Sequence, residues 1–327
     1  MNRRFDEALR TLRQGLTAPL SGVDRATLLI TLGEYTRELT LDNDGSRSIG
    51  EQAAGLTEGS ETPAMLLARA KAQVLIWSCV WKKEPALATA IAESTLLLFD
   101  QVKKSAPSLE PEDLWEISFD SAELNSTLGQ FDIASWQAEQ AVLSAPDRNQ
   151  ELNSLCQLGA IYRLAGRIVE SREILTRAIR LADVPAFTLV PSYYELALTE
   201  SALGKAAEAR AKIRRAIDIL QSDPTPPSHH LPDFLRFYAD ISYEMDDIEE
   251  AMGSFQAASD AYPTSDPEHW GCLLWVASLQ FTQGDLDSAS VNAERVRQSS
   301  FATVERREEA VALLAEIEKF AHREPRC

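Results

Sequence analysis

Apolar residues recur along this chain at the three- and four-residue spacing of amphipathic helices, in stretches separated by short turns. The stretch LGAIYRLAGRIVESREILTRAIRL, residues 158–181, shows the pattern well, with one apolar stretch on each side of Gly166. Small residues occupy Gly159, Ser171 and Ala178, where bulky core residues would be expected. This segment therefore predicts two helices that are joined by a tight turn and cross closely.

The same small residues recur around other candidate turns, seven residues before the turn, five after it and twelve after it. The turns that share these offsets are Gly129, Gly166, Gly204, Asp246 and Gly284. A weaker copy is centred on Lys83, with Ile76, Ala88 and Thr95 at the three positions. Two antiparallel helices approach closely only where side chains are small, and Gly or Asp at the turn adopts a positive φ at low cost. The chain is therefore predicted to repeat one helical hairpin.

This pattern resembles the tetratricopeptide repeat (TPR). The best copy contains Leu158, Gly159, Tyr162, Gly166, Leu175 and Ala178, and the next, YEMDDIEEAMGSFQAA, contains Tyr243, Ala251, Phe255 and Ala258. The resemblance implies an all-α fold, a right-handed α-solenoid of antiparallel helix hairpins that forms a TPR-like superhelix. The turns here are spaced more widely than in that family, so helices or loops must be longer.

The periodicity predicts sixteen helices, at 3–15, 23–40, 46–57, 62–81, 85–104, 110–128, 130–144, 148–165, 167–182, 187–203, 205–221, 230–244, 247–261, 267–283, 285–299 and 302–322. We expect divergent N-terminal helices at 1–60, forming half a repeat plus one hairpin, and about six TPR-like hairpins at 61–300. A capping helix and tail follow at 301–327, with Val311, Leu314 and Ile317 on its apolar face. Either the helix at 3–15 caps the front of the array, or the natural protein continues upstream.

Composition narrows the class of protein. Of 327 residues, 45% are hydrophobic and 25% charged, as in ordinary folded proteins. The sequence contains no long apolar segment and no signal-peptide pattern at its start, so we expect a cytoplasmic location without membrane association. The net charge of −18 disfavours direct binding to nucleic acid. Four widely spaced cysteines favour reduced thiols over a disulfide framework.

The residues that usually carry catalysis form no recognisable set. The sequence contains no GxxxxGK[ST], GxGxxG, HExxH or GxSxG motif. His269 and Cys272 lie three residues apart on one predicted helix, but two ligands do not make a zinc site. We therefore expect no cofactor, no metal and no enzymatic activity.

Charge is distributed unevenly along the chain. Residues 105–125 contain six acids and no base, and residues 231–272 contain ten acids and one base, whereas ten bases fall between Arg163 and Arg215. Much of the basic block lies on second helices. These runs are either solvated helix faces or parts of an acidic groove with a basic back.

The TPR resemblance implies that the first helix of each hairpin lines a concave groove, at about thirteen, ten, six and three residues before the turn. The candidate partner-binding residues at these positions are Trp77, Glu116, Phe119, Glu123, Arg163, Tyr194, Arg236, Asp240, Tyr243 and Phe281. Rigid aromatic surface with sparse charge suits peptide binding. The alternative is that the aromatic residues pack between neighbouring first helices.

These features favour a non-catalytic scaffold that binds a protein or peptide in the groove, with basic or aromatic segments as partners. The alternatives are the sensory or regulatory portion of a larger signalling or transcription-regulating protein and, with less support, an enzyme. Clamping of chaperone tails is disfavoured, because Arg163 and Arg236 are the only cations at the predicted groove positions and lie far apart in the sequence.

Overall fold

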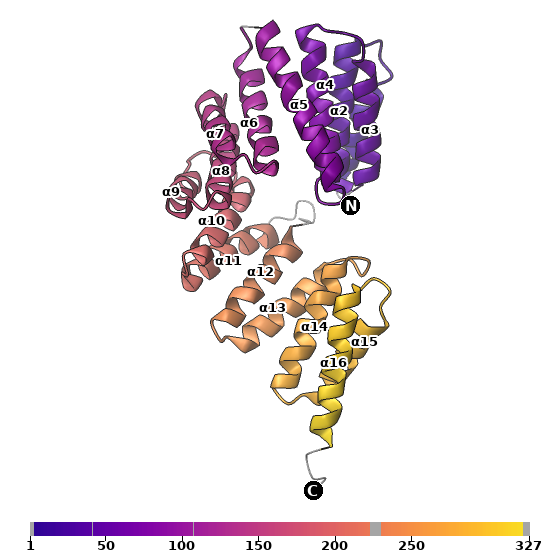
Figure 1. Ribbon diagram of the computed structural model, residues 1–327, viewed down its shortest axis with the longest axis vertical. Coiled ribbons are helices and arrows are strands. Elements are labelled where there is room, and N and C mark those ends of the chain that lie inside the picture. The colour runs from indigo at the N-terminus through magenta and orange to yellow at the C-terminus, as the bar shows by residue number, and fades with distance from the viewer. Residues whose placement is uncertain (1–2, 41, 107, 223–229, 323–327) are drawn as a thin grey trace. The chain divides into compact units, whose positions relative to one another are not determined.

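The computed structural model describes residues 3–40, 42–106, 108–222 and 230–322 (Figure 1). Over these ranges the chain forms sixteen α-helices and one short 3₁₀ helix, without a strand. It divides into two compact units, unit 1 (Met1–Val184) and unit 2 (Pro185–Cys327). The predicted all-α solenoid is confirmed.

The helices of unit 1 are α1 (Arg3–Gly15), α2 (Gly22–Thr40), α3 (Asn43–Leu56), α4 (Pro63–Val80), α5 (Pro85–Ser105), α6 (Pro111–Thr127), α7 (Phe131–Ser144), α8 (Arg148–Leu164) and α9 (Ile168–Ala178). Those of unit 2 are η1 (Ala186–Leu189), α10 (Val190–Ala202), α11 (Ala206–Ser222), α12 (Leu231–Glu244), α13 (Ile248–Ala261), α14 (Pro267–Thr282), α15 (Leu286–Gln298) and α16 (Val304–Ala321). In both units, neighbours in sequence pack as helix pairs, from α2–α3 to α14–α15.

The predicted turns adopt the predicted backbone conformation. All five have positive φ angles: Gly129 (72°), Gly166 (77°), Gly204 (72°), Asp246 (61°) and Gly284 (83°). At Gly166 the chain reverses through two hydrogen bonds, from the Gly166 amide to the Arg163 carbonyl (3.0 Å) and from the Arg167 amide to the Tyr162 carbonyl (2.8 Å). This is the left-handed helix ending that glycine favours.

The α8–α9 crossing shows why small residues recur. The Ser171 hydroxyl donates to the Gly159 carbonyl oxygen at 2.7 Å. A Cβ atom on Gly159 would lie 2.4 Å from the Cγ of Leu175, a fully buried side chain. The helices therefore pack at a distance that only a hydrogen at this position permits.

The α2–α3 pair forms the same type of crossing, although the sequence around it gives no clear repeat. The Ser46 hydroxyl donates to the Gly33 carbonyl oxygen at 2.8 Å, and both residues are buried. A Cβ on Gly33 would lie 2.4 Å from Leu75 of α4. Gly33 and Ser46 are thus the counterparts of Gly159 and Ser171.

The helix predicted at 167–182 is shorter than expected, because α9 ends at Ala178. The Arg180 and Leu181 amides donate to the carbonyl oxygens three residues earlier, those of Arg177 and Ala178, as in a 3₁₀ turn. Asp183 then takes a positive φ of 64°, and Pro185 disfavours a helical conformation at the preceding residue. The helix predicted at 187–203 accordingly begins with η1 and becomes α-helical at Val190.

The terminal helix α16 packs on α14 and α15, with Ala310 and Ile317 buried. The predicted apolar face is partly wrong, because Val311 is 51% exposed. The buried face is turned toward Ala310, whose small side chain fits against Leu273 and Leu274. Residues 323–327 of the predicted tail lie outside the described residues. Among the helices described, none has the length and apolar character needed to cross a membrane.

Candidate functional site

Polar side chains link the first helices of the unit 1 hairpins along one face. Lys71 Nζ of α4 lies 2.5 Å from Glu116 Oε2 of α6. The Trp115 indole N–H of α6 donates to the Ser154 hydroxyl of α8 at 2.8 Å. The Gln157 amide of α8 donates to the carbonyl oxygen of Phe119 at 3.0 Å. Polar contacts therefore join α4 to α6 and α6 to α8.

Carboxylates from α2 and α6 dominate this surface, to which α4 contributes Lys71. We define the acidic face as Glu34, Arg37, Lys71, Asp113, Glu116, Asp120 and Glu123. Five carboxylates thus face two cations. Lys71 serves both Glu116 and, at 3.9 Å, Asp113. The predicted residues Glu116 and Glu123 lie here, beside Asp113 and Asp120 of the same helix and Glu34 of α2.

Crowding and burial perturb these carboxyl groups. Burial, then the nearby Glu116 and Glu38, raises the pKa of Glu34 to about 7. Burial, followed by Glu116 and Glu123, raises the pKa of Asp120 well above its usual range. Glu34 is in contact with solvent, yet surrounding protein displaces enough water to disfavour its charged form. The acidic face therefore holds more carboxyl groups than its own two cations keep ionised.

The remaining candidates of unit 1 are the aromatic Phe119 of α6 and the basic Arg163 of α8. Phe119 is half-buried, and its ring centroid lies 5.3 Å from that of Trp115. Arg163 is half-buried in the last turn of α8. Phe119 is thus held by α6 itself and presents only part of its ring.

Trp77 does not occupy the predicted groove position. Its side chain is 3% exposed and belongs to the core beneath α4. The loop from Trp81 to Glu84 has one residue more than the loop after α6, so a turn placed at Lys83 shifts α4 by one position. Trp77 therefore corresponds to Leu124, which is fully buried.

In unit 2, charged residues connect α12 with α14. Arg236 lies 3.8 Å from Asp240 and 3.9 Å from Glu268. The Tyr262 hydroxyl donates to the carboxylate of Asp233. Burial, opposed by Arg236 and reinforced by Glu244 and Glu268, raises the pKa of Asp240 to about 6. This part of unit 2 also contains more carboxylates than cations.

The three aromatic candidates of unit 2 differ in availability. Tyr194 stacks on Phe234 at 4.5 Å, and Phe281 makes an edge contact with Phe320 at 6.1 Å. Both are half-buried, as expected for packing between helices. Tyr243 is 43% exposed, so it offers the most open ring of the three.

No known protein-family model matches this sequence, and no curated protein sequence matches it. Several solved structures are similar in fold. Yeast Tom70 matches at 15% identity over 97% of this chain and 59% of that one, with a TM-score of 0.61. The APC/C hetero-tetramer Cut9–Hcn1 matches at 12% identity over 96% and 52%, with a TM-score of 0.60. BtubC from P. vanneervenii matches at 15% identity over 75% and 96%, with a TM-score of 0.54. The chain has the tetratricopeptide-repeat fold.

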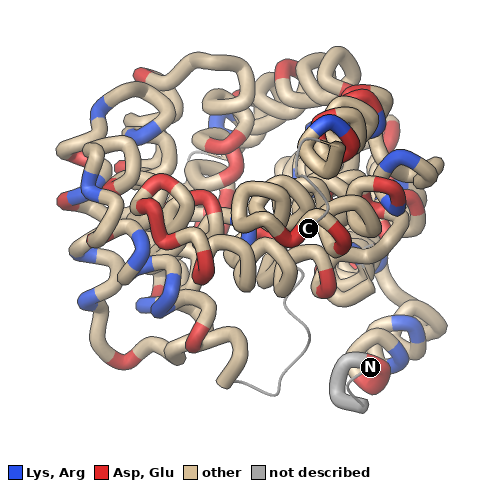
Figure 2. Tube along the Cα trace, turned by 90° about the horizontal axis from the view of Figure 1, so that it is seen from below, with Lys and Arg blue, Asp and Glu red and all other residues tan. Residues whose placement is uncertain are grey.

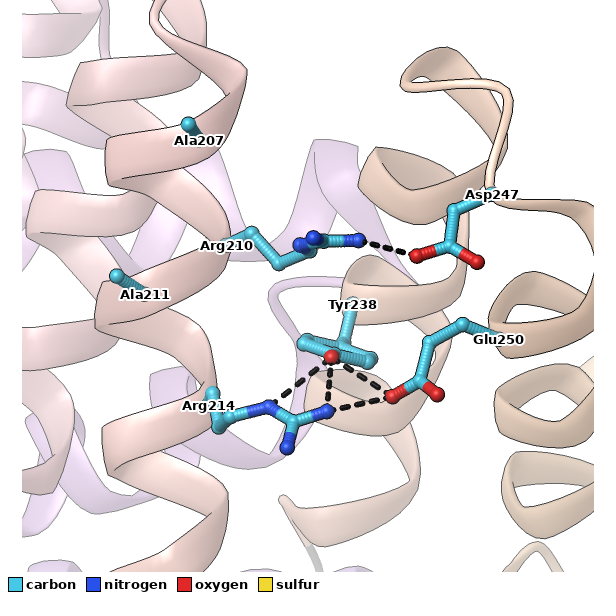
Figure 3. Close-up of a pocket in the computed structure, with 7 residues that line it drawn as sticks. All are labelled: Ala207, Arg210, Ala211, Arg214, Tyr238, Asp247 and Glu250. Carbon is cyan, nitrogen blue, oxygen red and sulfur yellow. Dashed lines mark hydrogen bonds and ion pairs between the residues drawn. The ribbon is translucent and has the colours of Figure 1, made fainter.

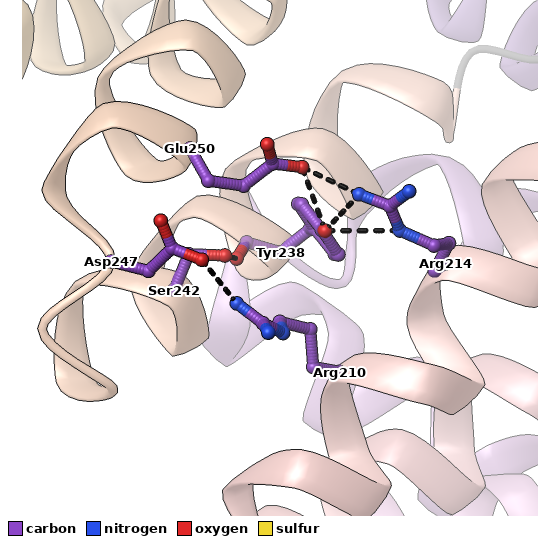
Figure 4. A network of polar contacts seen from close by, with 6 residues as sticks. All are labelled: Arg210, Arg214, Tyr238, Ser242, Asp247 and Glu250. Atoms are coloured by element: carbon purple, nitrogen blue, oxygen red, sulfur yellow. Dashed lines mark hydrogen bonds and ion pairs between the residues drawn. The ribbon is translucent and has the colours of Figure 1, made fainter.

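A pocket of about 380 Å³ lies among α11, α12 and α13 of this TPR fold (Figure 3). Arg210 of α11 meets Asp247 at 2.7 Å, and Arg214 meets Glu250 at 2.5 Å. The hydroxyl of Tyr238 accepts from Arg214 and donates to Glu250 (Figure 4). Two guanidinium groups thus face two carboxylates, so this part of the predicted basic back is neutralised and ties α11 to α13.

Other residues at these surfaces were missed from the sequence. They are Glu34, Arg37, Lys71, Asp113, Asp120, Glu268 and Trp275. Two signals could have found four of them. Gly33 opposite Ser46 places Glu34 and Arg37 at the expected lining offsets of α2, and Asp120 and Trp275 both lie nine residues before their turns. Asp113 and Glu268 both lie sixteen residues before their turns, beyond the predicted lining positions, and Lys71 required the structure.

Proposed function

We propose that this protein is a non-catalytic scaffold that binds a protein segment on the first-helix faces of its hairpins. We further propose that the acidic face of unit 1 selects a segment rich in Lys and Arg. The observation that carries the proposal is the convergence of five carboxylates from α2 and α6 around two cations, with raised pKa values at Glu34, Asp120 and Glu123.

A cationic segment would offset the desolvation that raises these pKa values and, at Glu34 and Asp120, the repulsion from neighbouring carboxylates. Its positive charges would favour the ionised carboxylates, so the binding free energy includes the relief of that repulsion. The acids outnumber the bases over the chain as a whole, 50 to 32, which also attracts a basic partner (Figure 2). A cytoplasmic location is part of the same proposal.

Ser259 and His269 lie close together but are not arranged as a catalytic pair. His269 Nδ1 lies 2.8 Å from the carbonyl oxygen of Ser259. Because a carbonyl can only accept, Nδ1 must carry the proton, and it is then unavailable as a base for the Ser259 hydroxyl. Ser259 and His269 are 1% and 6% exposed, respectively, so a substrate could not reach them. Among the residues described, no group of three or more His, Cys, Asp and Glu is placed to hold a metal ion.

The proteins of similar fold give this proposal a precedent. One of them, Cut9–Hcn1, is a hetero-tetramer, so the same fold takes part in assembly with a different chain there. We infer that protein binding is also the use of the fold here.

The test is binding of a fluorescein-labelled peptide built from a repeated Gly-Arg-Ser-Lys unit, followed by fluorescence anisotropy. The control peptide replaces each Arg and Lys with Gln. We expect binding of the basic peptide that weakens on raising NaCl from about 0.05 to about 0.5 M. The double variant Glu116→Gln/Glu123→Gln should raise Kd roughly 5- to 30-fold, at about 0.5–1 kcal/mol per charge.

The matched control is Glu93→Gln, which removes an exposed carboxylate from the second helix α5 of the same unit. It should leave Kd unchanged within about 2-fold. Equal binding of the Gln peptide, or an equal loss in Glu93→Gln and the double variant, would show that the acidic face does not select the partner.

A further inference from the structure

Two parallel sets of contacts join α12 to α14 in unit 2. Arg236 lies 3.9 Å from Glu268, and the ring centroids of Tyr243 and Trp275 lie 5.2 Å apart with an interplanar angle of 58°. Each step is seven residues long on its helix, so the two helices run side by side in one register for about 10 Å. We call this surface the α12–α14 seam, made of Arg236, Asp240, Tyr243, Glu244, Glu268 and Trp275.

One end of the seam is an exposed aromatic pair. Tyr243 is 43% and Trp275 36% exposed. Phe255, which is 1% exposed, stacks on Trp275 at 5.4 Å with an interplanar angle of 4°. Phe255 therefore covers one face of the indole and fixes its orientation. The rest of the pair remains as rigid π surface in contact with water.

The rest of the seam is acidic. Asp240 lies three residues before Tyr243 on α12, and Glu244 lies next to Tyr243 in sequence. Glu244 and Glu268 both act on the Asp240 carboxyl. Arg236 reaches Asp240 and Glu268 only at 3.8 and 3.9 Å, which exceeds hydrogen-bond length. Its Nε atom is buried and has no hydrogen-bond partner in the part of the chain that the structure describes. The three carboxylates therefore keep acceptor capacity for another donor.

We propose that the α12–α14 seam is a seat for an arginine side chain of a partner protein. The guanidinium stacks on the ring of Tyr243, beside Trp275, and donates its N–H groups to Asp240. Asp240 precedes Tyr243 by about 4.5 Å along the helix axis, so one arginine can make both contacts. Arginine fits better than lysine, because its planar group stacks on aromatic rings and still donates to a carboxylate in its plane.

This inference extends the proposed function to unit 2 and rests on it only in taking the ligand from a protein. The seat uses aromatic stacking as well as charge, whereas the acidic face of unit 1 uses charge. The two surfaces share no residue, so each can be removed without changing the other.

The experiment uses the full chain labelled with ¹⁵N and follows the indole N–H signals of its tryptophans by NMR. The probes are the blocked pentapeptide acetyl-Gly-Ala-Arg-Ala-Gly-amide and its Lys and Gln counterparts. Trp275→Phe assigns the Trp275 signal. We expect the Arg peptide to shift this signal saturably with a Kd on the order of 1 mM, the Lys peptide to bind more weakly, and the Gln peptide to give no shift.

Variants of Tyr243 distinguish the contribution of its aromatic ring from that of its apolar volume. Tyr243→Leu keeps an apolar side chain and should raise Kd about 3- to 10-fold, whereas Tyr243→Phe keeps the ring and should bind within about 2-fold of the original protein. Asp240→Asn should raise Kd by about 3-fold or more. Trp136 of α7, which is 54% exposed, is the matched control and should show no saturable shift.

Equal shifts with the Arg and Gln peptides, an equal response at Trp136, or unchanged binding in Tyr243→Leu would each overturn the arginine seat. Glu116→Gln/Glu123→Gln should leave the Trp275 titration unchanged. If the Arg peptide shifts the Trp275 signal saturably but the basic peptide does not bind the acidic face, only the proposal for unit 1 fails. If the basic peptide binds the acidic face but Trp275 does not respond, only the seat fails.

Discussion

Gly159→Ala places one methyl group into the α8–α9 crossing. The new Cβ would lie 2.4, 2.6 and 3.1 Å from Cγ, Cδ2 and Cδ1 of Leu175. Contacts of this kind are comfortable at about 3.5–4.0 Å. Leu175 is fully buried, so its Cγ can move away only by a change of rotamer within a packed core or by displacement of α9. Overpacking of this kind costs about 1–3 kcal/mol.

Gly253→Ala supplies the matched control. Gly253 lies in the middle of α13 and is exposed, and a Cβ there would meet nothing within 4 Å. The gain in helix propensity from Gly to Ala is about 0.8–1 kcal/mol at both sites. Local opening free energies, measured by native-state hydrogen exchange in α8 and α13, should therefore rise at Gly253→Ala. The change in opening free energy of α8 in Gly159→Ala should be less favourable than the change in α13 in Gly253→Ala by about 1–3 kcal/mol.

The double variant makes the reasoning refutable. Leu175→Ala removes the atoms that a Cβ on Gly159 would strike, so Gly159→Ala should become stabilising in that background. If Gly159→Ala stabilises α8 as much as Gly253→Ala stabilises α13, the crossing does not require glycine. The same conclusion follows if Leu175→Ala leaves the effect of Gly159→Ala unchanged.

Three further predictions concern the turn, the core and the acidic face. Gly166→Val should destabilise the hairpin by at least ~1 kcal/mol in thermal unfolding because φ is 77°, and Gly166→Asn should cost less, since Asn tolerates this region. Trp77→Ala should cost about 3–5 kcal/mol in denaturant unfolding through a core cavity, whereas Trp81→Ala, which removes a 44% exposed ring, should cost about 1 kcal/mol or less. Because the Glu34 pKa rises from 4.5 to about 7 on folding, stability should fall as pH rises through this window. Denaturant titrations at pH 4 and pH 8 should show that Glu34→Gln removes roughly 1 kcal/mol of this loss, since solvent contact screens the rest; an unchanged pH slope would contradict the shift.

The hairpins around Gly129, Gly166, Gly204, Asp246 and Gly284 could be predicted because their requirements are local. A tight helical turn needs a residue that tolerates positive φ, and a close crossing needs small residues at fixed offsets. Both leave marks in the sequence. The α2–α3 hairpin meets the same requirements with Gly33 and Ser46, but its turn lacks glycine and these two residues are thirteen rather than twelve residues apart, so the repeating offsets do not predict it.

The candidate surfaces could be predicted only in part. Glu116 and Asp240 lie among other carboxylates and Tyr243 is exposed, but their role in binding stays a prediction. Trp77 was misplaced because one extra loop residue rotates α4 by about 100° relative to the assumed register. An amphipathic helix carries no mark of such a shift when both neighbouring positions are apolar.

The sequence by itself determined the helices, the turns and the small residues at the crossings, since these depend on neighbours within one hairpin. Only the tertiary structure decided which charges meet. Glu34, Lys71 and Glu116 belong to three hairpins, and Tyr243 and Trp275 to two. Their proximity depends on the stacking of one hairpin on the next, which loop lengths set and helical periodicity does not record. The helical hairpins are therefore specified by local sequence, whereas the acidic face and the α12–α14 seam exist only after the hairpins have stacked.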